Sequence, residues 1–147
     1  MTPAEADKII FHSEDIDFSL PQPSLIIDWI FNCIESENKQ LRHLNFIFCS
    51  DEYLHKINVE YLNHDNYTDV ITFPYSEGKI IEGDIFISIE RIRENANKFN
   101  VDFNNELHRV MIHGVLHLLG YFDKTPNDKA LMTQKENEYL LKLMERN

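Results

Sequence analysis

An apolar segment with two histidines four residues apart constrains this chain more than any other part of its sequence. The segment HGVLHLLG begins at His113 and ends at Gly120, with Asp102 upstream. Its apolar residues recur with helical spacing, Asp102 is a residue type that begins helices, and glycine is one that ends them. Residues four apart lie one above the other on a helix, so His113 and His117 present two imidazoles on one side.

The residues after this helix predict a metal site. Gly120 ends the helix and lets the chain fold back, so the carboxylate of Asp123 can approach both imidazoles. Imidazoles bind zinc at about 2.0–2.1 Å, and three protein ligands plus a water are typical of catalytic zinc, whereas structural sites usually have four protein ligands. We expect His113, His117 and Asp123 to bind one Zn²⁺ or another divalent ion and to form the catalytic site of a hydrolase.

The bulk composition fits a globular chain that needs no metal to fold. It has 147 residues, of which 43% are hydrophobic and 27% are charged, with only four glycines and five prolines. A chain of this length can bury a full hydrophobic core. We therefore expect a single domain over residues 1–147, in which a bound metal serves chemistry more naturally than folding.

The cysteines and the N-terminal residues indicate a cytoplasmic protein. Cys33 and Cys49 lie beside apolar residues, which favours two small core side chains over a disulfide. Residues 1–7 lack the basic start and long apolar stretch of a secretory signal, and no run of about 18 apolar residues could span a bilayer.

The net charge of −11 argues against a protein that coats nucleic acid, because phosphate binding depends on Lys and Arg. Binding to nucleic acid would need a local basic surface. Two clusters could supply one, or could be ordinary solvated faces: Lys39, Arg42 and His43 form the first, and Arg91, Arg93, Lys98 and Arg109 the second.

Periodicity and capping residues predict a fold of the α+β class, with three or four strands in a mixed sheet and four or five helices. Strands are expected at 9–11, 44–49, 69–73 and 82–88, the third ended by Pro74. Helices are expected after the PQPS segment at 21–24, after Ser50, over 89–99, over 102–120 and after Thr125. Tyr61 is predicted on the inner side of its helix, and Leu131 on the apolar side of the last one.

Three stretches resemble signatures of the YbeY family, bacterial single-strand-specific endoribonucleases of ribosomal RNA maturation. HGVLHLLGYFD at 113–123 is similar to the family's H-G-x-L-H-L-x-G-Y-D-H, TDVITFP at 68–74 to T-D-V-L-S-F-P, and GDIFIS at 83–88 to G-D-I-x-I-S. Glu106 and Leu107 upstream of the histidines, and Met132 and Glu136 in the last helix, fit the family's order and spacing. The resemblance spans about residue 58 to the C-terminus.

The resemblance implies metal-assisted cleavage of single-stranded RNA, ribosomal RNA in particular, with ribosomal proteins or an Era-like GTPase as partners. It implies neither DNA nor a membrane. The chain departs from the family pattern where the third metal histidine falls on Asp123 and the preceding aspartate on Phe122. It departs again at Leu62, where the family usually has an arginine implicated in activity, so a cation for the substrate phosphate must come from elsewhere or be missing.

Other polar residues have open roles. Asp69 and Asp84 lie in the two strand motifs and could orient the ligand histidines or cap nearby turns. Thr68 could help a substrate groove or simply start a strand. His108 is predicted on another helix face and exposed, and the remaining histidines, which lack a spaced partner, are expected at the surface: His12, His43, His55 and His64.

Two other functions remain possible at this point. The protein could be a ribosome assembly factor whose metal is structural, a reading that the acidic balance and Leu62 favour. It could also be a peptidase or another small-molecule hydrolase. In zinc peptidases a glutamate follows the first histidine as general base, and this chain has Gly114 there.

Overall fold

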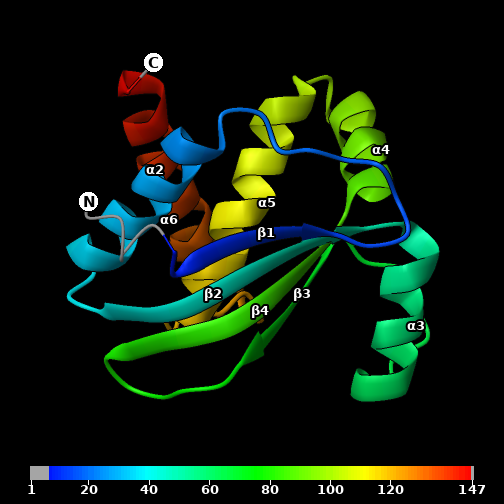
Figure 1. Ribbon diagram of the computed structural model, residues 1–147, viewed down its shortest axis with the longest axis horizontal. Coiled ribbons are helices and arrows are strands. Elements are labelled where there is room, and N and C mark those ends of the chain that lie inside the picture. Colours follow the sequence, from blue (N-terminus) through cyan, green and yellow to red (C-terminus); the bar gives the residue numbers. More distant parts are fainter. Residues whose placement is uncertain (1–6, 147) are drawn as a thin grey trace.

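The computed structural model describes residues 7–146, and within them the chain forms four strands and five helices (Figure 1). Residue 147 and the first six of the seven N-terminal residues considered above lie outside this range. The elements are β1 (Ile9–Ser13), α2 (Pro23–Ser36), β2 (Gln40–Cys49), α3 (Asp51–Leu62), β3 (Val70–Pro74), β4 (Ile80–Ser88), α4 (Ile89–Phe99), α5 (Phe103–Leu118) and α6 (Pro126–Glu145). None of the described helices is both long and apolar enough to cross a membrane.

The strands form one mixed sheet in the order β1-β2-β4-β3, which confirms the α+β class. β1, β2 and β4 run parallel, and β3 pairs antiparallel with β4 at one edge. The β3–β4 turn contains Gly78, whose φ of 70° lies in the left-handed region that glycine adopts at no steric cost. The parallel pair β1 and β2 is joined through helix α2, as parallel strands require a crossover.

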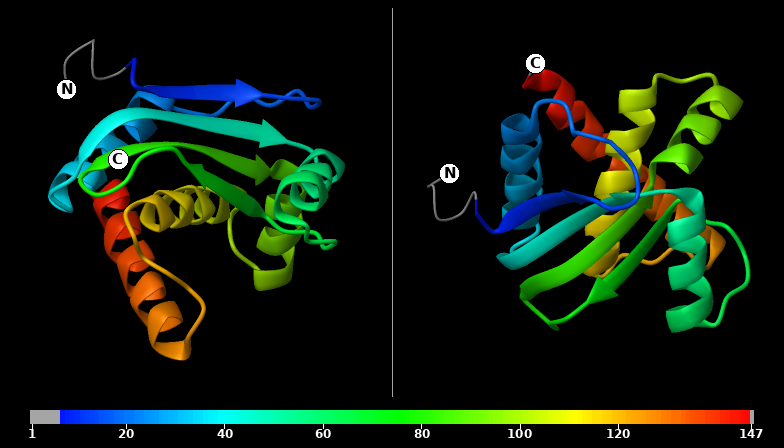
Figure 2. Two further views of the ribbon diagram at one scale, coloured as in Figure 1. Left: turned by 90° about the horizontal axis from the view of Figure 1, so that it is seen from below. Right: turned by 45° about the vertical axis from the view of Figure 1, so that its right-hand side comes forward.

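The main core lies between the sheet and helices α2, α5 and α6, which cover one face (Figure 2). We call this the inner face. Alternate residues of each strand point to it, among them Phe46, Ile85 and Ile87, all essentially inaccessible to solvent. Trp29 of α2 fills the space beside α6, and its indole nitrogen donates to the Tyr139 carbonyl at 2.8 Å.

The opposite face of the sheet, which we call the outer face, is only partly covered. Helix α3 packs over one end of it and buries Leu54, Ile57 and Ile71 in a smaller second core. Because α3 lies at the end of the sheet and not over its centre, part of the outer face stays open beside the helix (Figure 1).

A hydrogen-bonded carboxylate joins the end of α2 to the C-terminal part of the chain. Glu37 accepts a hydrogen bond from the Tyr121 hydroxyl at 2.7 Å and another from the Tyr139 hydroxyl. The Lys135 ammonium lies 3.3 Å from the same carboxylate. Burial acts to raise the pKa of Glu37, and these three donors more than offset it, so its pKa is lowered.

The predicted elements are confirmed, with longer strands, but the placements of the Tyr61 and Leu131 side chains were wrong. β2 begins at Gln40 and β4 at Ile80, because these residues pair with each other across the sheet and this long-range contact leaves no local pattern. Tyr61 was predicted to face inward but is 69% exposed, and Leu131 is 44% exposed. Leu131 lies beside the narrow buried stripe of α6. Tyr61 follows the buried stripe of α3, but it lies in the last turn of the helix, where the sheet no longer covers it. Both cysteines are buried and free, as predicted.

Candidate metal centre

Helix α5 and the turn after it bring the three predicted ligands together. The Asp102 carboxylate caps the helix by accepting from the backbone nitrogens of Asn104 and Asn105. At the other end Gly120 has a φ of 104°, and the Tyr121 nitrogen donates back to the Leu116 carbonyl at 3.0 Å. This left-handed ending reverses the chain, so Asp123 returns toward the helix face that carries the histidines.

The three side chains converge at metal-binding distance. Nε2 of His113 lies 3.3 Å, and Nε2 of His117 3.4 Å, from Oδ2 of Asp123. One potential ligand atom of each residue lies within 4.8 Å of the others. Two ligands bonded at about 2.0–2.1 Å to a tetrahedral ion lie about 3.3–3.4 Å apart. The donor set and its spacing therefore fit one small divalent ion.

A second carboxylate orients the first imidazole. Nδ1 of His113 lies 2.7 Å from Oε2 of Glu136 on α6, and Nη1 of Arg109 donates to the other carboxylate oxygen at 2.9 Å. The Glu136 side chain is only 9% exposed. A hydrogen bond at Nδ1 fixes the tautomer that leaves the Nε2 lone pair available to a metal, and it raises the basicity of the imidazole.

The pKa values of the two imidazoles shift in opposite directions. Burial acts to lower the pKa of His113, but the hydrogen bond to Glu136 and the nearby carboxylates more than offset it, so the pKa is raised. For His117, burial and the neighbouring His113 lower the pKa, and Asp123 offsets them only in part. His117 is therefore the more readily neutral of the two, as a metal ligand must be.

The three predicted ligands lie in an open pocket of about 460 Å³ at the edge of the sheet. Its walls come from the end of α3, the α3–β3 loop, β3 and α5. The lining residues are Asn58, Leu62, His64, Asn66, Thr68, Asp69, Val70, Ile71, Thr72, His113, His117 and Asp123. A smaller cavity of about 280 Å³ on the other side of His113 and Asp123 contains Arg109, Glu106 and Glu136.

The strand aspartates have different positions. Asp69 lines both cavities, where burial raises its pKa and the His113 charge partly offsets that rise. Asp84 neither touches the histidines nor caps a turn: it lies on the outer face, where it accepts from Asn45 at 3.0 Å and from the Tyr75 hydroxyl at 2.7 Å. Thr68 lines the metal pocket, in agreement with a place in a groove.

His108 lies on a helix face other than that of the predicted ligands, as expected, but the prediction that it is exposed was wrong. Its ring is half-buried and packs edge-on against Trp29 with centroids 6.1 Å apart, and burial lowers its pKa. Among the histidines expected at the surface, His64 is exposed and also lines the pocket mouth. His43 is half-buried, with its ring 3.1 Å from the Asn45 side chain.

The predicted basic clusters are largely paired within the protein. Arg91 donates to Asp51 at 2.6 Å, and Arg109 is held by Glu136 and Asn137. Arg42 lies 3.6 Å from Glu82. Arg42 and Arg91 belong to salt bridges of surface elements, which favours the interpretation of those residues as ordinary solvated faces, whereas Arg109 is part of the hydrogen-bonded group behind His113.

Sequence reasoning missed the role of Glu136, although a signal for it exists. Met132, Glu136 and Leu140 recur at helical spacing on α6, and all three are buried. A carboxylate on an apolar helix stripe needs a partner, because an unpaired buried charge is costly. Here the partners are Arg109 and His113, and no local pattern reveals them.

The chain is similar to known proteins over almost its whole length. The family model described as Endoribonuclease YbeY matches residues 8–144. A relative named Endoribonuclease YbeY from Amoebophilus asiaticus is 58% identical over 134 residues, which cover 90% of this chain and 91% of the relative. One from Christiangramia forsetii is 53% identical over 134 residues, covering 91% and 93%.

A solved structure also matches. The solution structure of TM1509 from Thermotoga maritima superposes with a TM-score of 0.68 at 27% identity, covering 94% of this chain and 90% of that one. Its fold is the one described above. With the family match, the identity to curated relatives and this likeness of fold taken together, the chain belongs to the YbeY family of endoribonucleases.

Proposed function

We propose that this protein cleaves single-stranded RNA at a phosphate held beside a divalent ion, and that His113, His117 and Asp123 bind this ion. The endoribonuclease activity follows from membership of the family, in which rRNA maturation is the known role. The observation that carries the assignment of the site is the convergence of three metal-binding side chains in an open pocket.

Zinc is the proposed ion. Two imidazoles and one carboxylate are a donor set typical of catalytic zinc, and the spacing of the donor atoms supports four-coordinate geometry. When bound, such an ion supplies Lewis acidity toward a phosphoryl oxygen and acidifies a bound water. Three protein ligands leave a position open to substrate, whereas a purely structural ion would usually have four.

The protein's own residues position the site. Glu136 accepts from Nδ1 of His113 and holds the ring so that Nε2 faces Asp123. Asp69 adds a second carboxyl group to the pocket wall, beside that of Asp123. Leu62 lies in the pocket where the family usually has an arginine, so cationic help for the phosphate falls to Arg109 in the adjoining cavity.

The proposed setting is ribosomal RNA maturation in the cytoplasm, with ribosomal proteins or an Era-like GTPase as partners. The net charge of −11 supports partners that deliver the RNA to the enzyme, because a strongly acidic chain attracts RNA poorly at long range.

Position 114 weighs against the peptidase alternative. A Cβ at Gly114 would lie 2.9 Å from Cγ2 of Ile85, so this position faces the sheet and not the pocket. A glutamate there could not act as the general base of a zinc peptidase.

The test compares the metal-loaded protein with its Asp123→Asn and His117→Ala variants. Each receives single-stranded RNA, the same RNA as a duplex, single-stranded DNA and casein, and bound metal is measured by elemental analysis. We expect the native protein alone to bind one ion and to cut single-stranded RNA. Glu77→Gln, a matched carboxylate-to-amide change in the exposed β3–β4 turn, should leave both properties intact.

The alternatives give different results. Metal binding and ribosome binding without RNA cleavage by the native protein would support an assembly factor and overturn the nuclease proposal. Casein cleavage that depends on Asp123 would support a peptidase. Equal RNA cleavage by the native protein and both variants would show that the activity does not arise at this site.

A further inference from the structure

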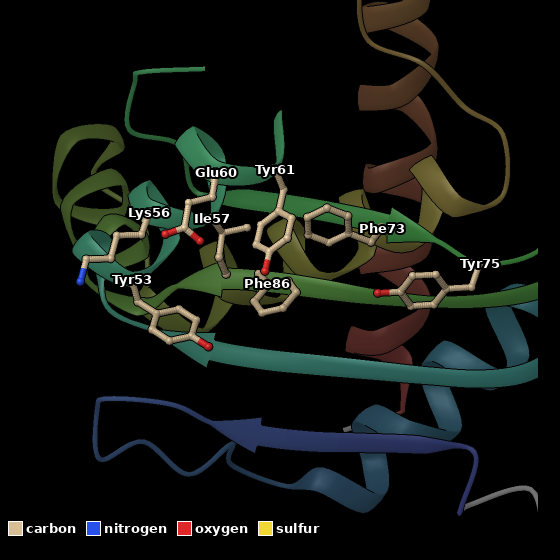
Figure 3. A pocket seen from close by; sticks show the side chains of 8 residues that line it. All are labelled: Tyr53, Lys56, Ile57, Glu60, Tyr61, Phe73, Tyr75 and Phe86. Atoms are coloured by element: carbon tan, nitrogen blue, oxygen red, sulfur yellow. The ribbon is translucent and has the colours of Figure 1, made fainter. Parts of the chain in front are cut away.

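A groove on the outer face of the sheet lies outside the metal pocket. It occupies about 590 Å³ between α3 and strands β3 and β4 (Figure 3). Its lining is mainly aromatic, and the residues are Tyr53, Lys56, Ile57, Glu60, Tyr61, Phe73, Tyr75 and Phe86. We call it the aromatic groove. Its volume lies within the range of about 300–1,000 Å³ that holds small organic molecules, so it has room for one or two nucleobases.

Three rings of this groove form a row of edge-on contacts. Tyr61 meets Phe73 edge-on with centroids 6.1 Å apart, and Phe73 meets Phe86 in the same way at 5.7 Å (Figure 3). Tyr61 and Tyr75 are 69% and 59% exposed. The Tyr75 hydroxyl donates to Asp84 at 2.7 Å, which holds its ring along β4. Tyr61 at one end of this row and Tyr75 elsewhere in the same groove are two large exposed rings that are available to a flat ligand.

The aromatic groove adjoins the metal pocket. At the end of α3, Tyr61 lines the groove and the next residue, Leu62, lines the metal pocket. Along β3, Phe73 lines the groove, and Thr72 lines the metal pocket. Because β3 is an edge strand, no further strand separates the two hollows. A chain molecule bound at the metal site therefore reaches the groove by crossing one strand.

We propose that the aromatic groove binds unpaired bases of the RNA next to the cleaved phosphate, by stacking on Tyr61 and Tyr75; this rests on the nuclease function proposed above. Aromatic side chains stack on any base, so such a site tolerates many sequences. Bases within a duplex have both faces covered and cannot enter. The groove therefore selects single-stranded RNA.

Charge supports stacking as the source of affinity. The charged residues of the groove, Lys56 and Glu60, balance each other, and the chain as a whole is acidic. Phosphate contacts therefore contribute little, and RNA affinity should fall less with salt than it does for basic RNA-binding proteins. Stacking on neutral rings needs no excess of positive charge.

The test measures RNA binding in an Asp123→Asn background, which blocks turnover and leaves the groove unchanged. The probes are an RNA of about ten nucleotides, a length within the range of single-strand binding sites, and a mononucleotide, whose single base cannot occupy the metal pocket and the groove together. Fluorescence anisotropy gives both dissociation constants. The ratio of the two dissociation constants measures how much more tightly the longer RNA binds. Each of Tyr61→Ala and Tyr75→Ala should reduce this ratio by about tenfold, the usual effect of removing one stacked ring.

Three controls keep the result interpretable. Tyr61→Phe and Tyr75→Phe retain the rings and should bind like the parent, which separates stacking from loss of fold. Phe99→Ala removes an exposed ring outside the groove, at the end of α4, and should have no effect. A 2-aminopurine placed beside the expected cleavage site should be quenched on binding, and the quenching should be lost when Tyr61 or Tyr75 becomes alanine.

Full binding of the longer RNA by both alanine variants would overturn the proposal while the nuclease function stands. Loss of ribosomal protein binding in these variants, with unchanged RNA affinity, would also overturn it and assign the groove to a protein partner. Failure of the native protein to cleave RNA, with groove-dependent binding intact, would instead refute the nuclease function alone.

Discussion

Replacing Glu136 by glutamine tests whether the carboxylate behind His113 controls metal binding. In the native protein each carboxylate oxygen has its own donor, Nδ1 of His113 at 2.7 Å and Nη1 of Arg109 at 2.9 Å. Glutamine has the same size but only one accepting oxygen, so its amide NH₂ must face one of these donors. The His113 ring then loses either its hydrogen bond or its fixed orientation.

The expected loss is about 10- to 100-fold in metal affinity, as for other changes to groups that orient a ligand histidine. This corresponds to about 1.4–2.7 kcal/mol of binding free energy. Competition with a chromophoric chelator measures the affinity, and denaturation of the metal-free protein by urea separates it from any loss of fold. Glu138→Gln, two residues further along α6 and paired with Lys135, is the matched control and should bind metal normally.

The pH dependence distinguishes this mechanism from a general loosening of the site. Glu136 raises the pKa of His113 against the effect of burial, so protons compete with the metal more strongly in the native protein. In Glu136→Gln this pKa falls, and proton competition weakens. The variant's deficit in affinity should therefore shrink as pH falls from about 8 to about 6, across the ordinary histidine pKa. Native affinity, or a deficit independent of pH, would refute the reasoning.

Three further predictions concern the scaffold. Gly83→Ala should destabilise the protein by about 1–3 kcal/mol in urea denaturation, because the new Cβ would lie 2.7 Å from the backbone oxygen of Phe73 on the paired strand, which cannot move freely. Glu37 has a lowered pKa in the folded protein, so its stabilisation is complete above the unfolded value near 4.5 and is lost as pH falls through the folded value. The Glu37→Gln variant should therefore have a lower free energy of unfolding than the native protein at neutral pH. Between about pH 5 and pH 3 its free energy of unfolding should fall less than that of the native protein. Burial raises the pKa of Cys33, and that of Cys49 to about 12, so neither thiol should react with Ellman's reagent until the chain is unfolded, when both should react.

The sequence was sufficient to predict that His113, His117 and Asp123 converge, because their geometry is local. Helical rise places His113 above His117, and Gly120 reverses the chain within the few residues before Asp123. Every step depends on neighbours in sequence. The predicted element types were right for a similar reason, since capping residues and apolar periodicity act within one turn or one strand.

Features that depend on tertiary packing could not be predicted from the sequence. Glu136 meets His113 across 23 positions of sequence, and only the packing of α6 on α5 brings them together. Tyr61 follows the apolar periodicity of α3, yet the helix covers only one end of the sheet and leaves it exposed. Asp84 shares a motif with the buried part of β4, but strand alternation directs it to the outer face.

The charge of the proposed metal site links Asp123 to the aromatic groove. If Asp123 binds the ion as proposed, its carboxylate, where the family pattern has a neutral histidine, would leave a divalent ion with one net charge, and Asp69 lies in the same pocket. One added negative charge at about 4 Å costs a phosphate about 4 kcal/mol at the effective dielectric constant near a protein surface. Leu62 supplies no compensating cation. Arg109 in the adjoining cavity is already paired with Glu136, so a large part of the RNA affinity must come from contacts that do not depend on charge, and exposed aromatic rings one strand away from the metal site are of that kind. An Asp123→His variant should accordingly bind RNA with a steeper dependence on salt, because restoring the neutral ligand would return part of the affinity to the phosphates.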